Sequence, residues 1–168
     1  MLESVVAVLR EACREVVVVG QPRQLELEAT FMADGFPRLG PLAGLVTGLE
    51  AICQPWALAV ACDMPLLRST ALRRLLDARE DGFDAVVPVV GGCAQPLHAL
   101  YRREAARSLA QVFHDGKRSP TAALTKLRVC WIPEEDFRHD DPSLSSFASI
   151  DTREEWEALT PMPCMRPS

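Results

Sequence analysis

The sequence predicts an α/β fold in which a mostly parallel sheet lies between two layers of helices. Apolar segments with helical periodicity alternate along the chain with short β-branched segments. Residues 56–61 (Trp-Ala-Leu-Ala-Val-Ala) show no polar alternation, which is typical of a strand buried on both faces of a parallel sheet. An aspartate and a proline follow this run at once and end it. These observations favour a three-layer, Rossmann-like domain.

The composition is that of one globular domain. The chain has 168 residues, of which 48% are hydrophobic, and this is enough for a substantial core. The net charge of -5 disfavours binding to nucleic acid, and no apolar run is long enough to cross a membrane. The first residues do not read as a secretion signal, and the six cysteines lack metal-binding or disulfide spacing, so we expect a cytoplasmic protein with reduced thiols. We expect one domain over residues 1–159 and a flexible tail over 160–168.

The first half of the chain predicts two helices and three strands. Residues 2–13 carry apolar side chains at helical spacing, and 16–19 form a valine-rich strand that Gly20 ends. A short strand over 29–33 is closed by Asp34-Gly35, and Pro41 opens a helix over 41–52. The central strand over 56–61 follows. A doubly wound fold normally opens on a strand rather than a helix, so its first strand is expected to be missing from this sequence.

The second half continues the alternation. A helix around residues 72–76 precedes two strands, over 85–90 and 96–101, that a turn at Gly91-Gly92 joins. Helices are predicted over 105–113 and after Ser119-Pro120, where serine is the N-cap and proline the first helical residue. A strand over 129–133, a polar loop over 139–146 and a terminal helix after the capping box at 152–155 complete the pattern. We expect strands 16–19, 56–61 and 86–90 to share one sheet.

Asp63 is the strongest candidate for chemistry. Ligands of open α/β sheets bind outside the carboxyl ends of the strands, where Asp63 follows residues 56–61. A carboxylate at this position can hold Mg²⁺, which prefers oxygen ligands and bridges substrate phosphates. The alternative is an aspartate that caps the helix beginning near Leu67. The spacing leaves both interpretations open.

Four further residues could belong to the same site. Asp34 also falls at a strand end and could face the same crevice as Asp63, although the Asp-Gly dipeptide by itself favours a turn. Gly40 precedes a helix whose first free amides favour an anion, but a tight loop-to-helix junction needs the same glycine. His98 could contact a phosphate or be a hydrogen-bonded structural residue. Asp151 could be a second acid or a turn residue beside the capping box.

Three motifs, in this order and spacing, give the sequence a family resemblance. They are Leu-Gly-Pro-Leu-Ala-Gly-Leu at 39–45, Ala-Cys-Asp-Met-Pro at 61–65 and Gln-Pro-Leu-His-Ala-Leu-Tyr at 95–101. The set resembles the molybdenum cofactor guanylyltransferases, which have a nucleotide-sugar-transferase-like α/β fold. Residues 150–155 are similar to the Asn-x-Asn-Thr-Pro-Glu-Asp segment near the end of that family. The resemblance extends from Leu2 to Leu159.

The resemblance implies a reaction and a set of ligands. In the family, GTP and Mg²⁺ bind at the strand carboxyl ends, and the terminal phosphate of molybdopterin attacks the α-phosphorus of GTP. Asp63 would be the Mg²⁺ ligand and touch the nucleotide, Asp34 would touch the nucleotide, and Gly40, His98 and Asp151 would be weaker candidates for nucleotide or metal contacts. The partners implied are GTP, the molybdopterin cofactor and maturation proteins of molybdenum enzymes.

The sequence departs from the family pattern at important positions. The family's opening strand, its glycine-rich phosphate loop and the lysine of that loop should stand before Met1, and Gly20, Ser149 and Asp151 replace asparagines. We therefore expect little activity from the chain as printed and restored activity in a form extended by this strand and loop. Three functions stay open: a guanylyltransferase, a related enzyme that uses CTP, and a non-catalytic domain that binds a pterin cofactor or partner proteins.

Overall fold

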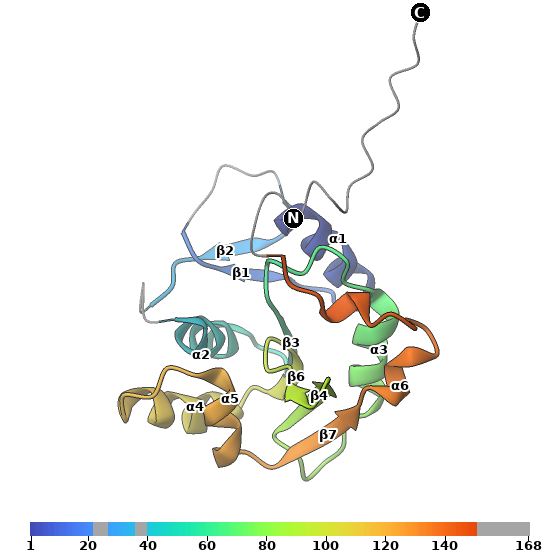
Figure 1. Cartoon of the computed structure of the whole chain (residues 1–168). Coiled ribbons are helices and arrows are strands. Elements are labelled where there is room, and N and C mark those ends of the chain that lie inside the picture. Colours follow the sequence, from blue (N-terminus) through green and yellow to red (C-terminus); the bar gives the residue numbers. More distant parts are fainter. Residues whose placement is uncertain (22–26, 36–39, 151–168) are drawn as a thin grey trace, which may run out of the picture.

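The structure, a computed structural model, describes residues 1–21, 27–35 and 40–150 (Figure 1). The predicted terminal helix, the tail and Asp151 lie outside these ranges. The described helices are α1 (Leu2–Ala12), α2 (Pro41–Ala51), α3 (Ser69–Asp77), α4 (Ala105–His114), α5 (Pro120–Ala123) and α6 (Glu135–Arg138), with 3₁₀ turns η1 (Leu124–Lys126) and η2 (Ser145–Phe147). The described strands are β1 (Val17–Val19), β2 (Thr30–Met32), β3 (Trp56–Val60), β4 (Ala85–Val90), β5 (Cys93–Ala94), β6 (His98–Arg102) and β7 (Val129–Pro133). None of these helices is long and apolar enough to span a membrane.

The main sheet is mixed and has β6 at its centre. Its strand order is β3-β6-β4-β5, and β7 also pairs with β4. β6 runs antiparallel to both β3 and β4, so β3, β4 and β7 point in the same direction. The tight turn after β4, in which Gly91 and Gly92 adopt φ of 57° and 75°, joins β4 to β5, and so short a connection can join only antiparallel strands. β6 continues in the direction of β5 and is therefore antiparallel to β4 as well. The α/β class is confirmed, with a mixed sheet.

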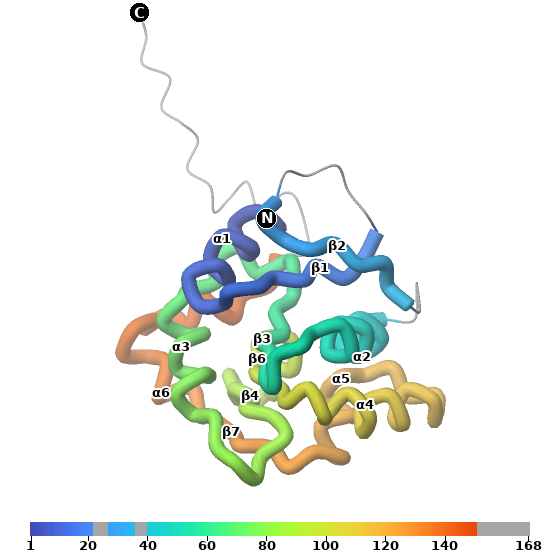
Figure 2. The backbone as a smooth tube through the Cα atoms, turned by 180° about the vertical axis from the view of Figure 1, so that it is seen from behind, coloured from blue at the N-terminus to red at the C-terminus, as the bar shows by residue number. Residues whose placement is uncertain are grey.

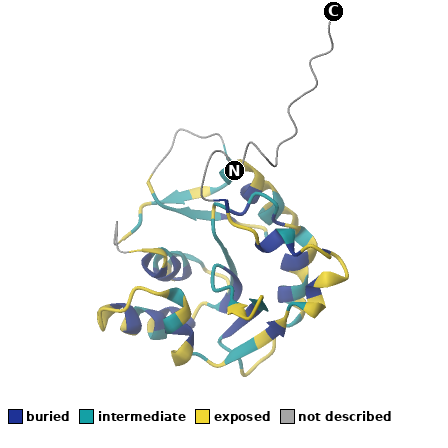
Figure 3. Cartoon of the chain, viewed as in Figure 1, coloured by how far each residue is buried: buried dark blue, intermediate teal, exposed yellow. Residues whose placement is uncertain are grey.

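Helices cover both faces of this sheet, as the sequence predicts. α2 and α4 lie on one face and α3 and α6 on the other (Figures 1 and 2). Successive residues of each strand alternate between the two cores, because side chains on a strand point to opposite faces. Ala85, Val87, Ala99 and Tyr101 pack toward α2 and α4, whereas Val86 and Leu100 pack toward α3 and α6. Figure 3 shows these buried segments in the interior and the exposed segments around them.

The prediction that residues 16–19 share a sheet with the strands at 56–61 and 86–90 is wrong for the described residues. β1 pairs in parallel with β2 and forms a separate ladder, with Val18 opposite Phe31. The separate ladder packs on α2, where a Cβ atom added to Gly48 would lie 3.4 Å from Cγ2 of Val19. β3 pairs with β6 along one edge, and no described strand pairs with its other edge. Side-chain packing on α2, rather than a continuous hydrogen-bonded ladder, therefore connects β1 and β2 to the main domain.

β3 is half-buried, whereas its apolar sequence predicts a strand buried on both faces. α1 and α3 cover part of it, because Val5, Leu67 and Leu72 form a small core against Leu58 and Val60. The difference arises at the edge of the sheet. A strand with neighbours on both sides is shielded along both edges, while β3 is shielded along one edge by β6.

The side chain of Leu109 tests the packing of α4 on the sheet. Leu109 is fully buried in the core that α2 and α4 form with the sheet. We expect Leu109→Ala to lower the free energy of unfolding by about 2–5 kcal/mol, since it removes apolar contacts and leaves a cavity. Arg107→Ala on the exposed side of the same helix should change it by less than about 0.5 kcal/mol. Urea denaturation of both variants measures the difference, and equal values would contradict the packing described.

Candidate functional site

Asp63 lies in the turn that follows β3. Its Oδ1 atom is buried and has no hydrogen-bond partner among the described residues. α3 begins later, at Ser69, with Arg68 as the N-cap and no side-chain capping hydrogen bond. The carboxylate therefore does not cap this helix, which was the alternative interpretation. A buried polar atom without a partner costs free energy, and its retention is a common feature of ligand-binding positions.

The donor set at this turn fits a hard divalent cation. Mg²⁺ is held in proteins by one or two carboxylates together with water and substrate phosphates, so one available carboxylate oxygen is a sufficient protein anchor. Asp151, the second predicted metal ligand, lies outside the described residues. Within those ranges, no three carboxylate, histidine or cysteine side chains form a metal-binding cluster. A metal ion at Asp63 would therefore need water or substrate oxygens to complete its coordination, and its binding there stays a prediction.

Asp34 and Gly40 flank the entry to α2. Asp34 lies two residues after the end of β2, and the next residue, Gly35, lies against α2, since a Cβ atom there would be 3.5 Å from Oγ1 of Thr47. Gly40 is the N-cap of α2 with φ of 90°, a conformation that glycine adopts without strain. No side chain caps the first turn, but Pro41 has no N–H and the amide of Ala43 donates to the carbonyl of Gly40 at 3.1 Å, so this turn offers few free amides to an anion. That Asp34 and Asp63 face one crevice stays a prediction.

His98 begins β6 and pairs with Val60 of β3. Its side chain is fully buried, and its ring stacks on Phe147 with centroids 4.3 Å apart. Neither ring nitrogen has a hydrogen-bond partner within the described part of the chain. Burial lowers the pKa of His98 to about 4, and the nearby backbone of Ser146 and carboxylate of Asp141 oppose this shift only in part. The stacking on Phe147 favours a structural role, although without the hydrogen bond that the sequence predicts, and a contact with phosphate stays a prediction.

The segment of residues 141–150, which we call the strap, is the part of the site region that the sequence did not reveal. The polar stretch 139–146 predicts an ordinary loop, yet Asp141 and Ser146 are buried within it. The strap reaches the turn after β3, where the amide of Ile150 donates a hydrogen bond of 2.9 Å to the carbonyl of Asp63. Figure 1 shows this red end of the described chain beside the green loop that follows β3. An aspartate followed by three serines within five residues was the available signal, since these side chains cap their own turns.

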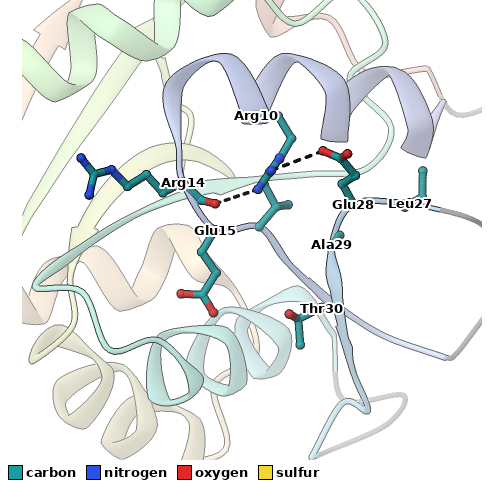
Figure 4. Close-up of a pocket in the computed structure, with 8 residues that line it drawn as sticks. Arg10, Arg14, Glu15, Leu27, Glu28, Ala29 and Thr30 are labelled. Carbon is teal, nitrogen blue, oxygen red and sulfur yellow. Dashed lines mark hydrogen bonds and ion pairs between the residues drawn. The ribbon is translucent and has the colours of Figure 1, made fainter.

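A hollow that Asp63 does not line lies at the amino ends of β1 and β2. It is formed by the end of α1 and the residues that precede the two strands, and Figure 4 shows its polar lining. Arg10 crosses it to reach Glu28, with Nη2 and Oε2 3.3 Å apart, and also donates to the carbonyl of Arg14. Because ligands of such folds bind at the opposite, carboxyl ends of strands, we do not assign the reaction to this hollow.

Comparison with known proteins assigns the chain to a family. The family model of the MobA-like NTP transferase domain matches residues 1–131, which include all described strands but the end of β7. The chain belongs to this family. The MobA-like match covers the turn with Asp63, the entry to α2 with Gly40, and His98, whereas the strap follows it.

Curated relatives and solved structures resemble the chain over most of its length. The molybdenum cofactor guanylyltransferase of Desulfosudis oleivorans is 32% identical over 159 residues, 94% of this chain and 79% of that protein. A probable molybdenum cofactor guanylyltransferase of Chloroflexus aggregans is 35% identical over 157 residues, 90% of this chain and 75% of that protein. The molybdopterin-guanine dinucleotide biosynthesis protein A of Archaeoglobus fulgidus has a TM-score of 0.75 and 26% identity, and the match covers 91% of this chain and 82% of that one.

A more distant structure shares the fold alone. The 2-C-methyl-D-erythritol 4-phosphate cytidylyltransferase of Thermus thermophilus is 19% identical, with a TM-score of 0.65 over 92% of this chain and 83% of that one. This likeness extends the α/β architecture beyond the MobA-like family and says nothing about the nucleotide that this chain uses.

The buried state of His98 predicts a pH dependence of stability. Because its pKa in the folded protein is about 4, below the ordinary value of 6.5, only the unfolded chain binds a proton between these values. The contribution of neutral His98 to the free energy of unfolding is fully present above pH 6.5 and is lost as the pH falls toward 4. The loss is on the order of 3 kcal/mol. His98→Phe, which keeps a ring against Phe147, should lose correspondingly less stability over this range.

Thermal or urea unfolding at pH 7 and pH 4.5 measures this difference. His114→Gln, at the exposed end of α4, is the matched histidine control and should keep the pH dependence of the wild type. An identical loss of stability in wild type and His98→Phe would contradict the buried, neutral state of His98.

Proposed function

We propose that this MobA-like chain transfers GMP from GTP to the molybdenum–molybdopterin cofactor, with pyrophosphate as the second product. Its membership of the family supports the proposal, as do relatives named molybdenum cofactor guanylyltransferase that align with 90% of the chain or more. The observation within the site that carries the proposal is the buried, unpartnered Oδ1 atom of Asp63 after β3. GTP and the molybdopterin cofactor are the substrates under this proposal, and Mg²⁺ is the metal.

The reaction is an in-line displacement at phosphorus. An oxygen of the terminal phosphate of molybdopterin forms a bond to the α-phosphorus of GTP, and the bond from this phosphorus to the α,β-bridging oxygen breaks. The bridging oxygen keeps the electron pair and leaves with pyrophosphate. Such a transition state needs little covalent chemistry from the protein, so catalysis consists of holding the two phosphates in line and offsetting their charge.

Two features of the chain supply this positioning. Asp63 provides an anionic oxygen at the carboxyl end of β3, and the turn that carries it is fixed by the backbone bond to Ile150. Gly40, which has φ of 90° and no side chain, would let the nucleotide approach the start of α2 closely. When bound at Asp63, Mg²⁺ would neutralise charge on the triphosphate as the pyrophosphate leaves. Asp34 would contact the nucleotide.

The choice of GTP over CTP rests on the named relatives. The similarity to a cytidylyltransferase concerns the fold, at 19% identity, and favours no second function. A parallel assay with GTP and CTP, with molybdopterin as acceptor and pyrophosphate release as the readout, tests the base directly. A cytoplasmic location is part of the proposal, because free GTP is a cytoplasmic substrate. The proposal also includes transfer of the cofactor to maturation proteins of molybdenum enzymes.

Replacement of Asp63 tests the proposed metal ligand. Asp63→Asn keeps the shape of the side chain and removes its charge, so we expect GMP transfer to fall by at least ~100-fold, the scale of losing one preorganised electrostatic contact. Binding of Mn²⁺ in the presence of GTP should weaken as well, while the melting temperature should change little. The assay uses the form extended by the family's opening strand and phosphate loop.

Asp136→Asn, an exposed carboxylate of α6, is the matched control and should behave as the wild type. Turnover of Asp63→Asn at the wild-type rate, with saturating Mg²⁺, would remove the assignment of Asp63. Turnover with CTP but not with GTP would instead leave the metal site in place and overturn the choice of base.

A further inference from the structure

Asp141 is the most densely bonded buried carboxylate among the described residues, and the proposed reaction does not use it. Its side chain is 2% exposed. Oδ1 accepts hydrogen bonds from the hydroxyls of Ser143, at 3.2 Å, and Ser145, at 3.0 Å. Oδ2 accepts from the amide of Ser146 at 2.7 Å, and Nε of Arg68 lies 3.6 Å from Oδ1. Burial disfavours ionisation, but the bonds from Ser146 and Ser145 outweigh it and lower the pKa of Asp141.

The strap organised by this carboxylate holds both ends of the loop that carries Asp63. At the first end, the amide of Ile150 donates to the carbonyl of Asp63 at 2.9 Å. At the second end, the amide of Arg68 donates to Oγ of Ser146 at 3.1 Å. Ser146 is fully buried, so the acceptor of this partly buried bond is held in the interior. The loop over residues 63–68 is therefore fixed at its start and at its end by one short segment.

Packing holds the strap itself in place. Phe147 stacks on His98 at 4.3 Å and meets Phe137 edge to face, with centroids 5.0 Å apart. Leu144 has φ of 55°, a strained conformation for a residue other than glycine, and its amide donates to the carbonyl of Asp141 at 2.9 Å. The strain persists because the bonds to Asp141 and the burial of Leu144 define the backbone on both sides. Loss of the carboxylate would release both the turn and the strain.

We propose that Asp141 is a positioning residue, which fixes the loop of residues 63–68 through the strap and so sets the carboxylate of Asp63 for a divalent cation. The inference rests on the proposed function, since it assigns a purpose to the geometry of Asp63. Outer partners that orient a metal ligand typically change metal affinity or activity by about 10–100-fold when they are replaced. Asp141 acts in this way through the backbone and through Ser146.

The test measures Mn²⁺ affinity by titration calorimetry in the presence of GTP. Asp141→Asn places an amide where the carboxylate accepts at least three hydrogen bonds, and should weaken Mn²⁺ binding by about 10–100-fold. Ser146→Ala is the milder variant, because it removes the acceptor for Arg68 and keeps the amide that donates to Asp141. It should weaken binding by about 10-fold. Hydrogen exchange of the loop over 63–68 should become faster in both variants.

Two controls separate this role from general destabilisation. Asp136→Asn changes an exposed carboxylate of α6 that lies outside the strap, five residues before Asp141. Asp84→Asn breaks an ion pair with Arg128 at the opposite end of β4, where Nη2 and Oδ1 are 2.9 Å apart. Both should keep wild-type Mn²⁺ affinity and wild-type exchange at 63–68, even where the melting temperature falls.

Each outcome decides the proposal. If folded Ser146→Ala and Asp141→Asn bind Mn²⁺ as tightly as the controls, Asp141 has a purely structural role and the proposal is overturned. If Asp141→Asn does not fold, Ser146→Ala decides alone. Asp63→Asn, measured in parallel, separates the two hypotheses: unchanged affinity in that variant overturns the metal site itself, whereas weakened affinity there together with wild-type affinity in the strap variants overturns only the role of Asp141.

Discussion

The ladder formed by β3, β6 and β4 is the constraint on which the rest of the molecule depends. β6 lies between β3 and β4, which point in the same direction, so β6 fixes the register of both neighbours. Leu100 stands opposite Leu58 on one side and Val86 on the other, and Tyr101 opposite Ala57 and Ala85. A slip of one residue would exchange the side chains that face the two helix layers, so both cores stabilise this register. The same register brings the start of β6, with His98, beside the end of β3.

Three aspartates of the molecule show how environment assigns different tasks to one side chain. Asp84, at the amino end of β4, accepts hydrogen bonds from Arg128, which lower the pKa of its carboxyl and join β4 to β7. Asp141 is buried and saturated with donors, so it stabilises the turn that begins the strap. Asp63 keeps a buried oxygen with no donor among the described residues. The unpartnered oxygen of Asp63 lowers the stability of the folded protein, whereas the hydrogen bonds of Asp84 and Asp141 raise it. Such a cost is expected where a protein keeps a position for a ligand.

The strap also explains how an unsatisfied carboxylate can be tolerated at the end of a half-buried strand. Ile150 and Ser146 hold the backbone of the loop at both ends, and Phe147 packs the strap onto His98. The loop therefore does not need the side chain of Asp63 for its own conformation. Structural and chemical tasks are divided between the strap, which is saturated with hydrogen bonds, and the turn, which is not. Under the proposed function, this division would hold the carboxylate of Asp63 in place before a metal ion binds.

The sequence by itself determined the alternation of helices and strands, because apolar periodicity and turn residues act locally: the strands at Ala85–Val90 and Val129–Pro133 and the N-cap at Ser119 lie where the pattern predicts them. It also singled out Asp63, since an aspartate that directly follows an apolar strand is a local signal. Tertiary structure alone decided that β1 joins β2 in a separate ladder and that β6 runs between β3 and β4, because strand pairing depends on contacts between distant segments. It alone revealed Asp141 as well. A polar loop and a buried polar strap have the same composition, and only the segments that cover them distinguish the two.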